Sequence, residues 1–262
     1  MTYLNFLILF VILPSFVMGI VFRRFLTRFW WGCIGLLAVI AVVWTTPWDN
    51  YLVANNVWWY DPQLVLGIVI GYVPLEEYSF FVLQTVFTGI LLAGLIGYSR
   101  IPVRPLRVLP WYARILPALP LVLLVAAFLL SRDQRFNYLI LSLGWLSLLP
   151  LAIQWFFGLD ILLQRWRVLL VGILIPSLWL TTMDSVALAA GTWTIAPDQT
   201  VGILLPGGVV PLEEGLFFLL TNTLIVQGLL LASAPESLTR ISSWRFQITR
   251  RFVKPRSELN HG

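Results

Sequence analysis

Two copies of the pentapeptide VPLEE, at residues 73–77 and 210–214, place pairs of adjacent carboxyl groups within very apolar sequence. Ionisable side chains at membrane depth are uncommon and usually functional. A carboxyl group that stays protonated in a dry site can donate a proton, and an ionised neighbour can accept one. The two motifs therefore predict acid–base chemistry. Their candidate catalytic residues are Glu76, Glu77, Glu213 and Glu214.

A plain helix start is the structural alternative for each pair. Proline in the first turn and glutamate just after it suit a helix N-terminus, where the dipole favours negative charge. Capping needs only one carboxylate, however, and successive helical residues point about 100° apart. Glu77 shares its stripe with Phe81 and Gln84, and Glu214 shares one with Phe218. These mixed stripes make Glu77 and Glu214 the first choice for proton transfer.

Asp49 and Asp184 are further candidate catalytic residues, each at the expected end of an apolar run. The helix dipole disfavours an anion there. One reading places each aspartate at the surface, just past the lipid boundary. The other turns each one toward the glutamates of its own half, where crowded carboxyl groups in a dry site keep one of them protonated.

Aromatic residues cluster around the first set of acids. The interfacial aromatic belt explains most of the 13 tryptophans, and ordinary packing explains at least one Phe of each Phe–Phe pair. An aromatic wall can nevertheless stabilise a cation through its ring faces. The predicted substrate-binding residues are Trp44, Trp48, Trp58, Trp59, Tyr60, Phe80, Phe81, Gln84, Trp179, Trp193, Phe217 and Phe218.

Membrane-spanning helices must position these residues. Of the 262 residues, 59% are hydrophobic and only 11% are charged, and the mean hydropathy is +0.88. Because lipid cannot satisfy exposed backbone groups, long apolar runs become helices. We predict an all-α integral membrane protein with seven transmembrane helices, at residues 2–22, 28–46, 74–98, 113–131, 137–157, 166–184 and 211–234. The apolar stretch 63–73 is too short to cross, so it is re-entrant, interfacial or an extension of the third helix, and 200–210 raises the same question.

Basic residues predict the orientation. With the N-terminus outside, all of the 17 Lys and Arg except Arg132 and Arg135 fall on the inside, as the positive-inside rule requires. We therefore expect a multi-pass protein of the cell membrane with a basic cytoplasmic tail at 237–262 that contacts anionic lipid. The basic residues form no single folded face, so nucleic acid is not an expected partner.

An internal repeat organises the chain. At an offset of 135, Trp44 matches Trp179, Asp49 matches Asp184 and Trp58 matches Trp193, and the first span matches the fifth. The two Pro-Leu-Glu-Glu motifs match after a two-residue adjustment. An offset of four spans keeps both halves in the same orientation, which predicts two parallel three-helix repeats joined by a linking helix. The predicted domains are a first repeat at 1–98, the linking helix and loops at 99–136, a second repeat at 137–236 and the tail.

Two segments of the first half make the sequence resemble a known family. TTPWDNYLVANNVWWY, followed by GYVPLEEYSFFVLQTVFTG, is similar to the membrane-integral lycopene cyclases of carotenoid synthesis. The chain resembles the form in which two small subunits are joined, and the resemblance extends to about residue 235. The second half departs from the pattern, with TTMDS in place of TTPWDN and GTWTI as its reduced aromatic segment.

The resemblance implies an isomerisation without net redox change. An acid protonates a terminal double bond of lycopene, the neighbouring double bond closes a six-membered ring on the resulting cation, and a base removes a proton. The position of proton loss decides between β, ε and γ rings, and we expect the β ring. The substrate is dissolved in the bilayer, so membrane lipids and contacts with other carotenoid enzymes are the remaining expected partners.

No cofactor or metal is expected. The single cysteine and the single histidine, His261, leave no Cys- or His-based metal site. The glycines at 89, 94 and 97 follow no strand, so they form no nucleotide fingerprint, unlike the flavin-containing cyclases.

Rival readings remain on the sequence, among them a purely structural membrane protein. A cyclase could act on an elongated C50 carotenoid or on one end only. A small proton-coupled transporter also suits parallel repeats and intramembrane acids, although the aromatic surroundings disfavour a hydrated pathway. A prenyltransferase would need paired aspartates for magnesium and diphosphate, and the chain has none. The sequence leaves undecided the ring type, the number of ends cyclised, the acid and base roles, and the oligomeric state.

Overall fold

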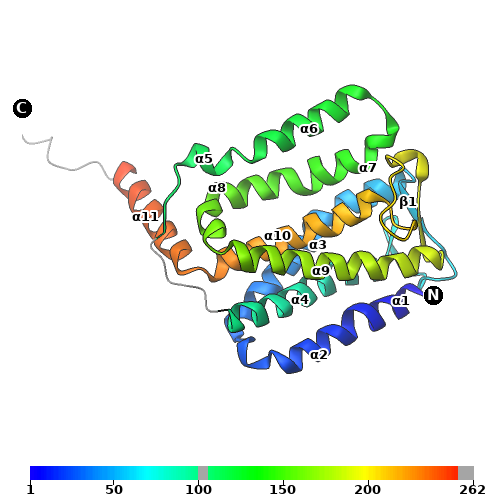
Figure 1. Cartoon of the computed structure of the whole chain (residues 1–262), viewed down its shortest axis with the longest axis horizontal. Coiled ribbons are helices and arrows are strands. Elements are labelled where there is room, and N and C mark those ends of the chain that lie inside the picture. Colours follow the sequence, from blue (N-terminus) through cyan, green and yellow to red (C-terminus); the bar gives the residue numbers. More distant parts are fainter. Residues whose placement is uncertain (100–105, 253–262) are drawn as a thin grey trace, which may run out of the picture.

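The computed structural model describes residues 1–99 and 106–252, and its long helices run side by side in one bundle (Figure 1). The first half begins with a helix that contains a π-helical segment and ends in the helix that carries the first glutamate pair. Its elements are α1 (Tyr3–Phe6), η1 (Leu7–Ile12), α2 (Leu13–Val21), η2 (Arg23–Phe25), α3 (Arg28–Ala54), β1 (Trp58–Tyr60), β2 (Val69–Ile70), β3 (Val73–Pro74) and α4 (Leu75–Tyr98).

The second half follows a similar order. Two shorter helices, α5 (Trp111–Ile115) and α6 (Ala118–Ser131), precede it. A second π-helical segment again interrupts the first long helix of the half, and α10 carries the second glutamate pair. The elements are η3 (Gln134–Phe136), α7 (Asn137–Ile140), η4 (Leu141–Leu148), α8 (Leu149–Gln164), α9 (Trp166–Ala189), β4 (Trp193–Ile195), η5 (Pro197–Gln199), α10 (Leu212–Ser233) and α11 (Pro235–Phe252).

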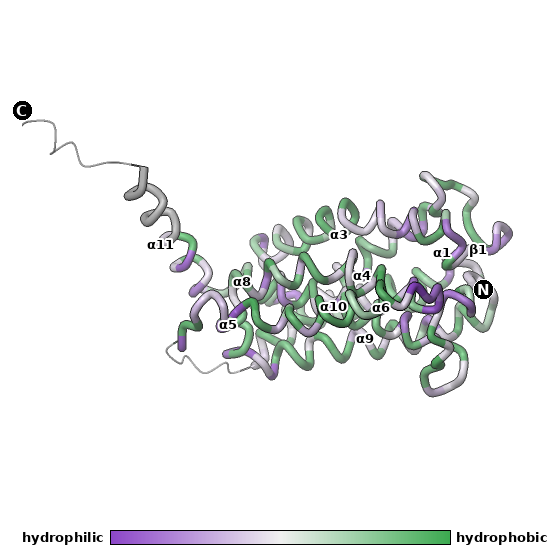
Figure 2. The backbone as a smooth tube through the Cα atoms, turned by 90° about the horizontal axis from the view of Figure 1, so that it is seen from above, coloured by the Kyte–Doolittle hydropathy of each residue, from purple (hydrophilic) through white to green (hydrophobic). Residues whose placement is uncertain are grey.

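The expected membrane architecture is confirmed at the level of an all-α membrane protein. Six of the described helical segments are long and apolar enough to cross a bilayer: Tyr3–Val21, Arg28–Ala54, Leu75–Tyr98, Gln134–Gln164, Trp166–Ala189 and Leu212–Ser233. Apolar residues dominate the middle of the bundle, and hydrophilic ones lie toward its ends (Figure 2). The predicted span 113–131 is divided between α5 and the 14-residue α6, with Pro117 between them, so a seventh crossing stays a prediction.

The second and sixth predicted spans were too short. Helix α3 continues through Pro47 to Ala54, and α9 continues to Ala189. Membrane helices tolerate an internal proline because neighbouring groups satisfy the freed carbonyl. Both aspartates therefore lie inside helices, where Asp49 and Asp184 are 0% and 1% exposed. The reading that placed them at the surface is wrong.

The apolar stretch 63–73 forms neither a re-entrant helix nor an extension of α4. It is an extended segment in which β2 and β3 pair antiparallel, with Val69 opposite Pro74 and Ile70 opposite Val73. The stretch 200–210 closes in a similar way, with Leu204 bridged to Pro211. Proline at the N-cap of α4 and α10 ends these extended segments, because its fixed φ suits the entry to a helix.

The two ends of the bundle carry different charge. The N-terminus and β1 lie at one end, and α11 lies at the other (Figures 1 and 2). The basic turns α2–α3 and α8–α9 are at the α11 end, while the α6–α7 turn with Arg132 and Arg135 is at the N-terminal end (Figure 1). This distribution is the one that the predicted orientation requires, and the side of the membrane stays a prediction. Five residues of the basic and histidine predictions lie outside the described residues: Arg100, Arg104, Lys254, Arg256 and His261.

The start of the predicted tail is fixed to the bundle. Arg240 of α11 is buried and pairs with Asp160 of α8, with 2.8 Å between Nη2 and Oδ2. Arg165 forms a second ion pair with Glu236 at 2.7 Å. Both partners of a buried ion pair are needed for stability, because removal of one leaves the other as an uncompensated charge.

Helices α4 and α10 are joined across the bundle centre by a buried polar network. Gln84 Nε2 donates to Thr221 Oγ1 at 2.8 Å, and Thr88 Oγ1 donates to Asn222 Oδ1 at 2.6 Å. The Asn222 amide donates to Ser177 Oγ of α9 at 3.2 Å. Such interhelical bonds stabilise packing within a membrane. They fix the two helices that present the glutamate pairs.

Candidate active site

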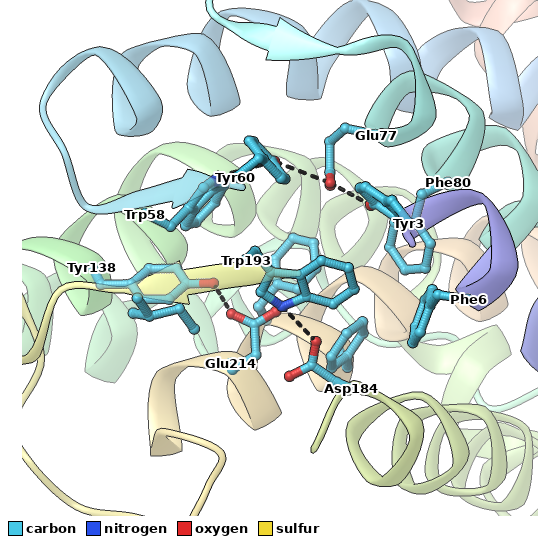
Figure 3. Close-up of a pocket in the computed structure, with 13 residues that line it drawn as sticks. Tyr3, Phe6, Trp58, Tyr60, Glu77, Phe80, Tyr138, Asp184, Trp193 and Glu214 are labelled. Carbon is cyan, nitrogen blue, oxygen red and sulfur yellow. Dashed lines mark hydrogen bonds between the residues drawn. The ribbon is translucent and has the colours of Figure 1, made fainter. Parts of the chain in front are cut away.

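One cavity between the two halves brings acids from both motifs together (Figure 3). Its volume is about 40 Å³, and Glu77 and Glu214 are only 9% and 8% exposed. The lining combines three carboxyl groups with tyrosine hydroxyls and aromatic rings. Its residues are Tyr3, Phe6, Trp58, Tyr60, Glu77, Phe80, Tyr138, Asp184, Trp193, Ile195, Glu214, Phe217 and Phe218.

Glu77 accepts hydrogen bonds from two tyrosines. Tyr3 Oη donates to its Oε2, and Tyr60 Oη donates to the same oxygen at 3.1 Å. Trp58 Nε1 in turn donates to Tyr60 Oη at 3.1 Å. Burial, followed by the nearby carboxyl groups, raises the pKa of Tyr60 well above its ordinary value. The Tyr60 hydroxyl therefore keeps its proton and acts as a hydrogen-bond donor.

Glu214 accepts from a single tyrosine in the described part of the chain. Tyr138 Oη donates to Glu214 Oε2 at 2.6 Å. Tyr138 stands 135 residues after Tyr3, so the two halves use matched tyrosines on matched glutamates. The residue 135 positions after Tyr60 is Ile195, which has no hydroxyl to offer. The second half therefore lacks one donor that the first half has.

The two aspartates differ in their surroundings. Trp193 Nε1 donates to Asp184 Oδ1 at 3.1 Å, and Asp184 lines the cavity (Figure 3). Asp184 Oδ2 is buried without a hydrogen-bond partner among the described residues. Asp49 is absent from the lining, and among those same residues neither of its buried oxygens has a partner. The structure thus places Asp184, but not Asp49, on the cavity that Glu77 and Glu214 line.

The first glutamate of each pair has a different task from the second. Glu76 Oε1 accepts the backbone N–H of Leu66 at 2.5 Å, and Glu213 Oε1 accepts that of Val201 at 2.6 Å. Both carboxyl groups hold the extended segment that precedes their own helix. The structure does not place Glu76 or Glu213 on the cavity, so each Glu–Glu pair separates a loop anchor from a cavity acid, as the 100° turn between neighbours requires.

The predicted aromatic and amide residues divide into three groups. Trp58, Tyr60, Phe80, Trp193, Phe217 and Phe218 line the cavity. Trp44, Phe81 and Gln84 instead line a second cavity, to which Phe217 also belongs. Fully buried Trp48 lines neither cavity and stacks on Phe217. Trp59 is 44% exposed, and Trp179 donates to the Phe10 carbonyl.

Four lining residues were not anticipated: Tyr3, Phe6, Tyr138 and Ile195. For Tyr3 and Tyr138 a signal existed, because they are identical residues at the same offset of 135 as the matched aspartates. Phe6 lies one turn after Tyr3 and packs edge-on against Trp193 at 5.1 Å. Only the folded chain places Tyr3 and Tyr138 beside glutamates more than 70 positions away.

Local structure explains how the tyrosines and tryptophans are fixed. The backbone N–H of Tyr3 donates to Leu64 O at 2.8 Å, which ties the first helix to the segment before α4. A π-helical segment, η1 or η4, follows each tyrosine, and such segments are frequent at functional sites. Trp48 Nε1 donates to Leu141 O of η4 at 2.9 Å. The π-helical segment η4 thus supplies a backbone carbonyl that accepts an indole N–H near the site.

Strands β1 and β4 close the cavity at the N-terminal end of the bundle. They pair antiparallel, with Trp58 opposite Ile195 and Tyr60 opposite Trp193. The central pair, Trp59 and Thr194, is 135 residues apart, and Trp58 lies opposite the residue that matches Tyr60. Each half therefore contributes the same strand to the pair. Among residues 1–99 and 106–252, no group of three or more His, Cys, Asp or Glu side chains could hold a metal ion.

Comparison with known proteins gives a consistent result. The family model described as Lycopene cyclase matches residues 1–95 and 137–229. The chain belongs to the lycopene cyclase family. Membership confirms the resemblance noted from the sequence, and the chain is an enzyme that cyclises lycopene. The unmatched interval, 96–136, corresponds to the predicted linking segment.

Individual relatives agree with the family. A lycopene beta-cyclase of Halobacterium salinarum is 39% identical over 202 residues, which cover 76% of this chain and 81% of the relative. A bifunctional lycopene cyclase/phytoene synthase of Aspergillus oryzae is 32% identical over 253 residues, or 90% of this chain and 42% of that protein. A protein of the same description from Phycomyces blakesleeanus is 35% identical over 199 residues, covering 72% of this chain and 32% of the relative. No solved structure matches the chain.

Proposed function

We propose that the chain converts both linear ends of lycopene into β rings by acid–base catalysis in the cavity that Glu77, Glu214 and Asp184 share. The observation that supports this most strongly is the meeting of three buried carboxyl groups with a mostly aromatic lining in one small cavity. The β ring is proposed because the Halobacterium relative is described as a lycopene beta-cyclase. Substrate and product are both hydrocarbons without heteroatoms, so apolar contacts are enough for the one to enter and the other to leave.

The proposed reaction balances without an oxidant or reductant. A carboxylic acid adds a proton to the terminal double bond, and the electrons of the next double bond form the new ring C–C bond. The positive charge then rests on a ring carbon, where the faces of Phe217, Phe218 and Trp58 stabilise it. A carboxylate removes a proton from the adjacent ring carbon and regenerates a double bond. Water exclusion protects the cation from capture.

Hydrogen bonding suggests the separate roles. Glu77 Oε2 accepts two hydroxyl donors, which suits a carboxylate that receives a proton. Asp184 Oδ1 accepts the Trp193 indole, and its Oδ2, without a partner among the described residues, is free to direct a proton at the substrate. We assign proton donation to Asp184 and proton removal to Glu77. Glu214, on the same cavity, exchanges protons between these carboxyl groups and solvent between turnovers.

The proposal includes the membrane arrangement. We propose two parallel three-helix repeats, related by a pseudo-two-fold axis through the β1–β4 pair and joined by α5 and α6. Two observations support this layout. Strands β1 and β4, which occupy matched positions in the two halves, pair antiparallel, and each half has a matched tyrosine–glutamate hydrogen bond. With the basic turns in the cytoplasm, the N-terminus and the cavity lie toward the outer face of the cell membrane.

Cyclisation in heavy water tests the chemistry. Each ring that forms by protonation from an exchangeable carboxyl group gains one deuterium from solvent, so β-carotene made in D2O carries two. Chromatography of pigment from lycopene-producing cells identifies the ring, and mass spectrometry of the product from purified enzyme counts the deuterium. A different ring, one unreacted end, or a product without deuterium would contradict the corresponding part of the proposal.

A further inference from the structure

A second and larger cavity adjoins the acid cavity. Its volume is about 380 Å³, and it lies between α3, α4, α10 and the η4–α8 helix. Phe217 is part of the wall of both cavities, so the two adjoin at its side chain. Phe217 stacks on Trp48 with their ring centroids 5.5 Å apart and their planes 4° from parallel. The second cavity is called the side groove below.

The side groove opens on the lipid-facing surface of the bundle. Ile40, Leu149 and Ile153 belong to its lining and are 50%, 54% and 59% exposed. Its α3 wall runs from Leu37 to Thr45, which is roughly 12 Å along the helix axis at 1.5 Å per residue. A long hydrocarbon dissolved in the bilayer therefore has direct access to it from the side.

The polar side chains of the side groove are mostly occupied by the protein itself. Thr85 Oγ1 donates to Phe81 O at 2.8 Å, Thr221 Oγ1 donates to Phe217 O at 2.9 Å, and Gln154 Nε2 donates to Leu224 O at 2.9 Å. Because these donors are satisfied, the groove offers a ligand chiefly methyl, methylene and ring surfaces. Such a lining binds hydrocarbon, and its buried Gln154 Oε1 is a polar atom without a hydrogen-bond partner among the described residues.

We infer that the side groove binds the linear polyene chain of the carotenoid while the end group reacts behind Phe217. This inference rests on the proposed function, because it takes the acid cavity as the place of ring closure. A cavity of about 40 Å³ can hold only the reacting end, so the remainder of the long molecule needs an apolar path to the bilayer. The shared wall makes the side groove that path, and it favours the carotenoid over a phospholipid chain that would have no end group to deliver.

Protection of an engineered thiol measures occupancy directly. The native Cys33 is first changed to Ser, and Glu77→Gln with Glu214→Gln prevents turnover. Ile40→Cys then places a thiol at the groove mouth, and Val39→Cys places the matched control on the same helix outside the groove, where position 39 is 62% exposed. In proteoliposomes with lycopene at ten times its Kd, alkylation of the Ile40→Cys thiol by N-ethylmaleimide should slow about tenfold, and that of the Val39→Cys thiol should not change.

Two results would overturn the inference. Equal alkylation rates with and without lycopene, in protein that still retains the pigment, would mean that the polyene lies elsewhere. Alkylation at position 40 that is already about tenfold slower than at position 39 without lycopene would mean that a lipid acyl chain occupies the groove. Ile153→Cys on the opposite wall repeats the measurement if Ile40→Cys does not fold.

A steric variant gives an independent readout in active enzyme. Ala41→Trp fills the side groove, and Val39→Trp adds the same ring to the lipid-facing surface. Only Ala41→Trp should lower the yield of cyclised pigment, and equal yields would count against the groove. If the Glu77→Gln, Glu214→Gln protein still cyclises lycopene, the acid–base proposal fails, whereas the protection result stands because it reports binding alone.

Discussion

The Glu77 side and the Glu214 side of the cavity share one plan and differ in two contacts. Each glutamate accepts a hydrogen bond from a tyrosine in the first helix of a half, Tyr3 or Tyr138. Among the described residues only Glu77 accepts a second hydroxyl, from Tyr60, since Ile195 stands at the matching position of the other half. The repeat therefore supplies a common scaffold on which single substitutions create unequal sites.

The tryptophans at 58 and 193 show the same divergence. Trp193 donates its indole N–H to the aspartate of its own half, Asp184. Trp58 donates to Tyr60 instead. Asp49 therefore receives no indole N–H from Trp58, whereas Asp184 receives one from Trp193. A duplicated motif thus need not give duplicated chemistry: the first half builds a glutamate with two donors, and the second half builds an aspartate held on the cavity.

Removal of the cavity carboxyl groups should have the largest effect. Glu77→Gln keeps the shape of the side chain but cannot remove a proton, so cyclisation should fall about 10²–10⁴-fold. Glu214→Gln should reduce the rate less, because its proposed role is proton exchange between turnovers. Initial rates of purified variants with lycopene in vesicles provide the measurement. Glu76→Gln is the control, and an equal loss there would refute the division between the two glutamates of a pair.

The aspartates provide the next comparison. Asp184→Asn removes the proposed proton donor and should slow cyclisation about a hundredfold, whereas Asp49→Asn should leave most of the activity because Asp49 is not on the cavity. Both variants retain a side chain of similar size. Solvent deuterium content of residual product distinguishes slowed chemistry from background. Greater loss in Asp49→Asn than in Asp184→Asn would reverse the assignment of the two halves.

Loss of single tyrosine hydroxyls should have intermediate effects that expose the asymmetry. Tyr138→Phe leaves Glu214 without a tyrosine donor and should lower the rate about tenfold, given that a hydrogen bond to a charged group contributes about 1.5–3 kcal/mol. Tyr60→Phe leaves Tyr3 on Glu77 and should have the smaller effect. Steady-state kinetics at saturating lycopene test the order. Identical losses would indicate that the second donor on Glu77 matters as much as the first.

The loop anchors should have the smallest effect on chemistry and an equal effect in both halves. Glu76→Ala and Glu213→Ala each leave a backbone N–H, that of Leu66 or Val201, without its acceptor. Either change should lower the free energy of unfolding by about 1–3 kcal/mol and leave the rate per folded molecule nearly unchanged. Thermal unfolding in detergent, beside the kinetic assay, separates the two quantities. A larger kinetic than thermal effect would place these glutamates in the reaction.

Sequence reasoning was most successful where membrane physics leaves few choices. Lipid satisfies no backbone groups, so the apolar runs had to be helices, and six of them are long and apolar enough to span. It failed at Pro47, where the expected helix end does not occur because a membrane helix continues through proline. It also could not describe 63–73, since an apolar segment of that length fits several conformations.

What the sequence determined by itself was the chemistry available: two repeated Glu–Glu motifs, matched aspartates and tyrosines, and an aromatic content suited to a cation. The tertiary structure alone decided which of these groups meet. Helical geometry turns neighbouring glutamates about 100° apart, but only packing selects which one faces the cavity and which one holds a loop. Contacts such as Tyr3–Glu77 and Tyr138–Glu214 join residues more than 70 positions apart, and their geometry exists only once both halves of the bundle have closed on each other.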